Sequence, residues 1–157
     1  MSEGREETDL ERLDRNLIEL MGELRVALPG VQVLFAFLLV APFNQRFGSV
    51  TQFERRLYFA ALLCTLLSCI LLIAPTLVHR LQFRLGQKAH IVTLANRLTI
   101  MGLTVFAIAM TCAVLLVTHY LFGTTTAVVT TVIVAIAFVV TWYLLPLRNR
   151  RNCTPQP

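Results

Sequence analysis

Residues 57–78 read LYFAALLCTLLSCILLIAPTLV, a run of 22 residues without one charged side chain. A helix at the surface of a water-soluble domain needs a polar face, and this run has none. At about 1.5 Å per residue it forms a helix of roughly 33 Å, which is enough to cross a hydrocarbon core of about 30 Å. The run therefore predicts a membrane-spanning α-helix.

Three further apolar runs occur in the chain. They cover residues 26–43, 99–122 and 124–145. Helices are the expected form, because an open sheet in lipid would leave backbone groups without hydrogen bonds. The first run is the weakest, since Pro29, Gly30 and Gln32 lie near its start. We predict an all-α fold, a four-helix transmembrane bundle, with residues 26–147 as the membrane domain and Gly123 at a tight turn between the last two spans.

The composition agrees with a membrane protein. Of the 157 residues, 56% are hydrophobic and only 15% are charged, whereas about a quarter are charged in ordinary soluble domains. The start of the chain lacks the basic and apolar regions of a cleaved secretory signal, so we expect the first run to stay as a permanent span. The four cysteines show no spacing of a disulfide framework and are expected to be small apolar fillers.

Lysine and arginine residues predict the orientation, because cytosolic connections carry an excess of them. The N-terminal segment, the connection between the second and third spans and the basic tail 148–157 together hold eleven. The other two connections hold three. We therefore expect a multi-pass protein of the cell membrane with both termini in the cytosol and the lipid bilayer as its surroundings.

Residues 1–25 are predicted to form a cytosolic segment with an amphipathic helix over about 9–25. Its leucines recur at spacings of three and four; they are Leu10, Leu13, Leu17, Leu20 and Leu24. Thr8 and Glu11 have the spacing of a capping box. The polar face is acidic overall, whereas a helix that binds anionic lipid is normally basic, so docking against protein is favoured.

Acidic residues of this helix and basic residues of the second connection lie on the same predicted side. We predict a cytosolic charge clamp, whose members are Glu19, Glu23, Arg84, Lys88 and Arg97. The alternative is a set of independent solvated charges. Exposed ion pairs contribute only about 0–1 kcal/mol each, so either arrangement has a small effect on stability.

Polar side chains within the spans are few. The candidate polar membrane positions are Gln32, Ser68 and His119. His119 lies next to Tyr120 and fits a plain boundary residue, with a proton relay or cation ligand as the alternative. Glu54 is assigned to the first connection, beside Arg55 and Arg56, so no carboxylate is expected inside a span.

Residues that could hold a metal do not gather at ligand spacing. His79 and His90 flank the second connection without an accompanying cysteine or carboxylate. Cys112 and His119 are two helical turns apart. Phosphate-binding loops and nucleophile elbows are also missing. We expect no catalytic residue, cofactor, metal or small-molecule substrate, hence not an enzyme, and basic segments that maintain topology rather than bind nucleic acid.

Small residues recur every four positions in the spans, which lets helix backbones approach closely. The stripes are Ala60, Cys64 and Ser68; Ala61, Thr65 and Cys69; Ala109 and Ala113; and Ala127, Thr131 and Ala135. We expect them to pack the bundle, although one of them has the composition to face a second subunit.

Several segments resemble an uncharacterised bacterial family of small four-span membrane proteins, classed as a domain of unknown function. They are ELRVALPGVQVLFAFLLVAPFNQRF at 23–47, APTLVHRLQFR at 74–84 and NRL at 96–98. The resemblance covers about residues 10–147 and implies no activity or site residue. Some similar proteins carry a sodium/proton antiporter label, which the expected lack of a carboxylate in the spans does not support.

The sequence thus favours a non-enzymatic structural or interaction protein that acts through self-association, as a homo-oligomer, or through a membrane protein partner. The alternative is a small oligomeric channel or cation/proton transporter, with a pore lined by weakly polar side chains. Hydroxyl groups in such spans can equally bond back to their own helices.

Overall fold

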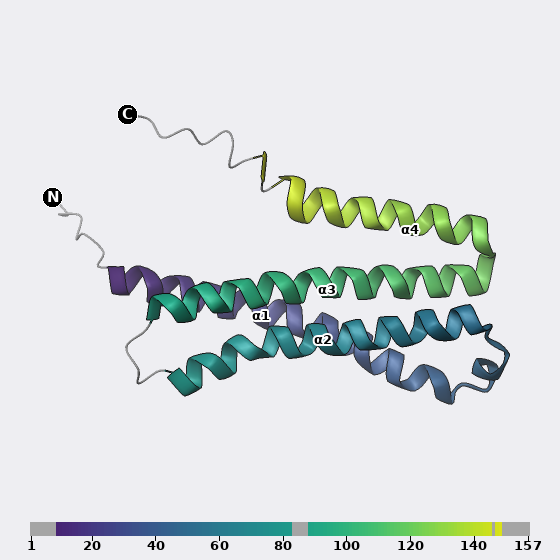
Figure 1. Ribbon diagram of the computed structural model, residues 1–157, viewed down its shortest axis with the longest axis horizontal. Helices are drawn as coiled ribbons and strands as arrows, with labels where there is room; N and C mark the ends of the chain where they lie inside the picture. The colour runs from purple at the N-terminus through teal and green to yellow at the C-terminus, as the bar shows by residue number, and fades with distance from the viewer. Residues whose placement is uncertain (1–8, 83–87, 146, 149–157) are drawn as a thin grey trace.

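The computed structural model describes residues 9–82, 88–145 and 147–148, and every regular element in these ranges is helical (Figure 1). The elements are α1 (Asp9–Val40), the 3-10 turns η1 (Ala41–Phe43) and η2 (Gln45–Ser49), α2 (Gln52–Gln82), α3 (Lys88–Phe122), α4 (Thr124–Val139) and the π-helical turn η3 (Val140–Leu144). The predicted all-α fold is confirmed.

Within these ranges, four helical stretches are long and apolar enough to cross a membrane. They are Ile18–Phe43, Gln52–Val78, Val92–Phe122 and Thr124–Leu144. The first three begin at residues 18, 52 and 92, five to eight residues before the apolar runs predicted from residues 26, 57 and 99. Each of these helices includes charged residues before its charge-free run, so the first residue of that run does not mark the start of the helix.

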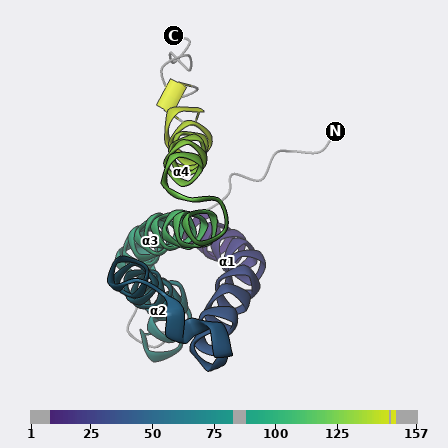
Figure 2. The ribbon, with the colours of Figure 1, turned by 90° about the vertical axis from the view of Figure 1, so that its right-hand side faces the viewer.

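The helices α1, α2 and α3 pack against one another, and α4 packs against α3 but against neither α1 nor α2. Seen along the bundle, α4 stands outside the group that the other three form (Figure 2). The start of α1 and the last turn of α4 lie at the same end of the molecule (Figure 1). An even number of antiparallel helices brings the first and the last helix ends to the same end of the bundle.

The amphipathic segment and the first span belong to one helix, α1, which continues through Pro29. Leu20 and Leu24 are buried in one apolar cluster with Leu72 of α2 and Ala95 of α3. The other stripe positions lie outside the described side chains; they are Leu10, Leu13 and Leu17. Where it is described, the leucine stripe therefore docks on its own chain.

The interface between α2 and α3 depends on a glycine. A Cβ atom at Gly102 would lie 2.7 Å from Cδ2 and 2.8 Å from Cγ of Leu72, a side chain that is fully buried. Ser68 Oγ donates a hydrogen bond of 2.8 Å to the Gly102 carbonyl. Thr65 and Ala61, about one and two turns before Ser68 in α2, are also fully buried. Ala61, Thr65 and Ser68 thus pack the bundle, as expected for the small residues of α2, whereas Ala60 is exposed.

The turn between α3 and α4 is Gly123, as predicted. Its φ of 82° and ψ of −179° lie in a region that only glycine adopts without strain. The last two helices therefore form a hairpin with a single residue between them.

Candidate functional site

A reciprocal capping box formed by Thr51 and Glu54 closes the start of α2. Glu54 Oε2 accepts hydrogen bonds from the Thr51 backbone N–H at 2.7 Å and from the Thr51 hydroxyl at 2.9 Å. The Glu54 backbone N–H donates in turn to Thr51 Oγ1 at 3.3 Å. This pattern satisfies N–H groups that have no partner within the first helical turn. Sequence reasoning missed it, although the spacing Thr-x-x-Glu at 51–54 was visible.

The second oxygen of Glu54 meets His119 of α3. His119 Nδ1 lies 3.1 Å from Glu54 Oε1, and Glu54 is only 5% exposed. With Glu54 ionised, Nδ1 is the donor, because a carboxylate only accepts hydrogen bonds. Nε2 of the same ring lies 3.4 Å from the hydroxyl of Thr124, the first residue of α4. The imidazole therefore connects the start of α2, the end of α3 and the start of α4.

The position of Glu54 corrects its assignment to the first connection. Glu54 belongs to α2 and to the apolar stretch Gln52–Val78. The physical reason is the capping box, which starts the helix five residues before the charge-free run at Leu57. His119 is accordingly more than a plain boundary residue, since it is the tertiary partner of that carboxylate.

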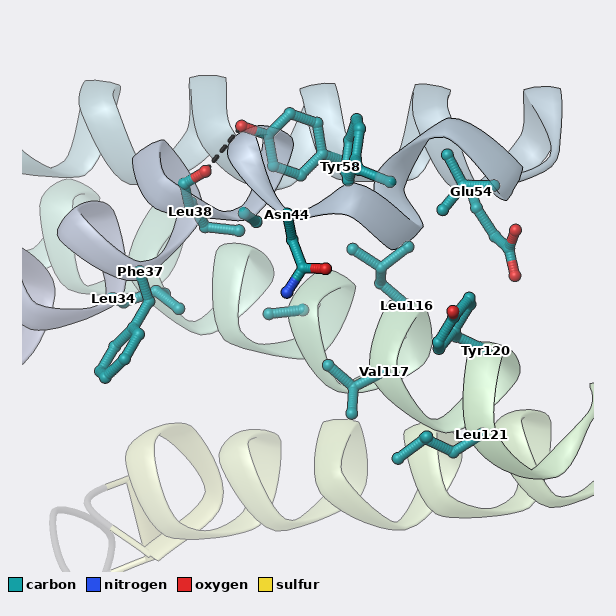
Figure 3. A pocket seen from close by; sticks show the side chains of 14 residues that line it. Leu34, Phe37, Leu38, Asn44, Glu54, Tyr58, Leu116, Val117, Tyr120 and Leu121 are labelled. Carbon is teal, nitrogen blue, oxygen red and sulfur yellow. Dashed lines mark hydrogen bonds between the residues drawn. The ribbon is translucent and has the colours of Figure 1, made fainter.

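A cavity of about 430 Å³ adjoins Glu54 (Figure 3). Its walls come from α1, the connection between α1 and α2, α2 and α3, and they are mostly leucine, valine, alanine and phenylalanine. Tyr58 forms part of the wall of the cavity, and its hydroxyl donates to the Leu38 carbonyl at 2.7 Å (Figure 3). The polar lining residues are Asn44, Glu54, Tyr58 and Tyr120. The volume falls in the range of about 300–1,000 Å³ that small-molecule pockets have.

A second cavity of about 420 Å³ lies beside the first and contains two arginines, Arg55 and Arg56. Phe47 and Tyr58 belong to the walls of both cavities. Their rings pack edge to face with centroids 5.1 Å apart. This end of the bundle therefore combines an apolar cavity, a buried carboxylate and exposed cations.

The three predicted polar membrane positions do not form one site. His119 pairs with Glu54, Ser68 is buried in the interface between α2 and α3, and Gln32 is exposed on α1. The three side chains come from different helices and different levels of the bundle. Polarity alone, which singled them out in the sequence, does not indicate which side chains meet.

The charge clamp at the opposite end stays a prediction. Glu19 Oε1 lies 3.9 Å from Nε of Arg15, one turn earlier in α1, and both side chains are largely exposed. Glu23 and Arg97 are exposed. Of the remaining members, Arg84 lies outside the described residues. Lys88 belongs to α3, but its side chain lies outside the described part of the structure.

Metal-ligating side chains do not cluster in the part of the chain that the structure describes: no group of three His, Cys, Asp or Glu residues there could hold an ion. His79 and His90 fall outside the described side chains. The chemistry of the site is thus that of hydrogen bonds between a carboxylate, an imidazole and hydroxyl groups beside an apolar cavity.

Fold and site together define an all-α protein whose described residues include four helices of membrane-spanning length and apolarity. At one end, buried Glu54 of α2 meets the partly exposed His119 of α3, which also lies beside Thr124 of α4. Residues 6–146 match the model of DUF6328, a family of unknown function. The chain belongs to this family, which confirms the resemblance noted in its sequence. No curated protein and no solved structure matched the chain.

Proposed function

We propose that this protein is a non-enzymatic membrane protein that acts by association, and that its partner is a second copy of the same chain. The observation that carries the proposal is the position of α4, which packs against α3 and against neither α1 nor α2. Most of the surface of α4 is thereby available to other molecules. Homo-oligomers with twofold symmetry use one such surface on both subunits.

The outward stripe of α4 is apolar and regular. Val129, Ile133 and Ile136 are 55%, 61% and 56% exposed, at spacings of four and three that place them on one face of the helix. Ala127 is the buried contact of α4. Lipid tails are as apolar as these side chains, so close packing rather than the hydrophobic effect would drive two such faces together.

Contacts at both ends fix α4 on α3. At its start, the Thr124 hydroxyl lies beside His119. Beyond its other end, in the turn η3 that follows α4, the Tyr143 hydroxyl forms a hydrogen bond with the Thr104 hydroxyl of α3. A helix held at two points presents its outer face in one orientation, which lowers the conformational cost of association.

The internal use of polar side chains supports a non-enzymatic role. Ser68, Tyr58 and Glu54 are buried, and each is hydrogen-bonded to a backbone or side-chain group of its own chain. Groups engaged in this way stabilise helix packing.

Cysteine cross-linking tests the association. In a chain whose four natural cysteines are replaced, Ile133→Cys places a thiol on the outward stripe of α4. The matched control, Leu67→Cys, places one at the middle of α2, where the leucine is 47% exposed. We expect oxidation of intact membranes to give covalent dimers with Ile133→Cys and few with Leu67→Cys. Equal yields at the two positions, or monomers only, would contradict the proposal.

The proposal also places the chain in the cell membrane with both termini in the cytosol. It is supported by the eleven lysine and arginine residues on one predicted side against three on the other. Reporter fusions at each terminus test it: a fluorescent protein should be active at both ends, and an enzyme that requires export should be active at neither.

A second candidate function, a cation or proton transporter, is favoured by buried Glu54 and its partner His119. Ionisable groups inside apolar helices are costly and commonly serve transport. Vesicles loaded with pH- and cation-sensitive dyes distinguish the two functions. Protein-dependent flux that disappears with Glu54→Gln and persists with Gln32→Leu would replace association by transport as the primary function.

A further inference from the structure

We infer that the cavity beside Glu54 holds the acyl chain of a phospholipid from the surrounding bilayer. The inference depends on the membrane location of the protein, and it is independent of association through α4.

The cavity is closed toward α2 and open between α1 and α3. On the closed side, Leu38, Glu54 and Tyr58 are 7%, 5% and 8% exposed. At the rim, the exposed fractions are 72% for Phe37 of α1 and 54% and 62% for Val117 and Leu121 of α3. Figure 3 shows these rim side chains on the side of the cavity remote from Tyr58. The entrance therefore lies between two helices, at their sides.

The depth of the entrance identifies the surroundings. Phe37 belongs to the apolar stretch Ile18–Phe43, and Val117 and Leu121 belong to Val92–Phe122. Both stretches are of membrane-spanning length, so an opening between them faces lipid. Water is a poor occupant, because most of the lining is apolar and the buried polar side chains Glu54 and Tyr58 already have hydrogen-bond partners in the chain.

The distribution of polar groups matches a phospholipid with its chain in the cavity. Asn44 and Tyr120, which line the cavity, lie near the ends of the two apolar stretches. Arg55 and Arg56, in the adjoining cavity, are exposed at the same end of the bundle. Arginine is well suited to bind phosphate. The acyl chain of a phospholipid would therefore contact apolar side chains in the cavity, and its phosphate would lie near the two arginines.

Photolabelling tests the inference on the full chain in vesicles. The probe is phosphatidylglycerol with a diazirine in the middle of one acyl chain, and labelled peptides are mapped by mass spectrometry. We expect label on Leu38 and Tyr58, which surface lipid cannot reach, in addition to label on Leu67, which is exposed on α2 outside the cavity. Label on Leu67 without label on Leu38 or Tyr58 would overturn the inference.

Two variants separate occupancy of the cavity from loss of folding. Ala113→Phe fills the cavity from α3, and Val117→Trp obstructs its exposed rim. The matched control Ala60→Phe changes an exposed alanine of α2 outside the cavity. We expect either cavity variant that retains its helicity to lose the label on Leu38 and to keep it on Leu67, while Ala60→Phe keeps both. Retention of label on Leu38 in both cavity variants would overturn the inference.

Discussion

The two ends of the bundle differ in how they use charge. Where α1 begins, charged side chains are numerous, and Glu19, Glu23 and Arg97 are exposed. At the opposite end, Glu54 is buried and bonded to Thr51 and His119. The sequence placed the predicted charge clamp at the first end. Burial together with specific partners points to the second end as the candidate site, because a carboxylate withdrawn from water persists only where donors compensate it.

The interface between α2 and α3 joins the two ends, so the largest effect is expected there. Gly102→Val should destabilise the protein by about 3 kcal/mol, since its side chain would overlap buried Leu72. The matched control is Gly30→Val in α1, where an added Cβ meets nothing within 4 Å. Thermal unfolding in detergent measures both. Similar melting temperatures for the two variants would show that α2 and α3 are not tightly packed at Gly102.

The next effect concerns buried Glu54 and its partner His119. His119→Leu should cost about 2 kcal/mol, because it leaves one oxygen of buried Glu54 without its donor. Arg55→Gln, at an exposed neighbour, should change stability by less than about 0.5 kcal/mol. Combining His119→Leu with Glu54→Gln should cost less than the sum of the single changes. Strict additivity in this double-mutant cycle would mean that the two side chains do not interact.

A smaller effect is expected from a neutral hydrogen bond between helices. Ser68→Ala removes the bond to the Gly102 carbonyl, and such bonds in membrane proteins contribute about 0.6 kcal/mol. Thr141→Ala serves as control, because the Thr141 hydroxyl bonds to the Ala137 carbonyl of its own helix. Chemical unfolding curves for both variants check the difference. If Ser68→Ala lowered the free energy of unfolding as much as His119→Leu, the neutral bond between α2 and α3 would contribute as much as the bond between His119 and Glu54, which would contradict this ranking.

The smallest effect is expected at the charged end. Glu23→Lys and Arg84→Glu should each cost about 0.5 kcal/mol, and the double reversal should restore part of the loss if the clamp forms. The loss should shrink in high salt, which screens exposed charges. A double reversal that restores nothing would show that these are independent solvated charges.

Helix number and order were predictable from the sequence, because apolar runs of membrane length have few other solutions. The turn at Gly123 followed for the same reason. Helix starts were less accessible: α2 begins at Gln52, and only the Thr51 and Glu54 spacing indicated it. The pairing of Glu54 with His119, 65 residues apart, depends on how α2 and α3 are aligned. Apolar periodicity does not determine that alignment, and the cavity follows from it too.

The turn at Gly123 also bears on how the chain is made. Because one residue separates α3 from α4, no loop is available to cross a bilayer after α3 has inserted. If both termini lie in the cytosol, as proposed, the two helices enter as a hairpin with His119 and Thr124 at its leading tip. The bond between His119 and Glu54 then forms after that tip has reached the far side, so its formation would mark the completion of membrane insertion.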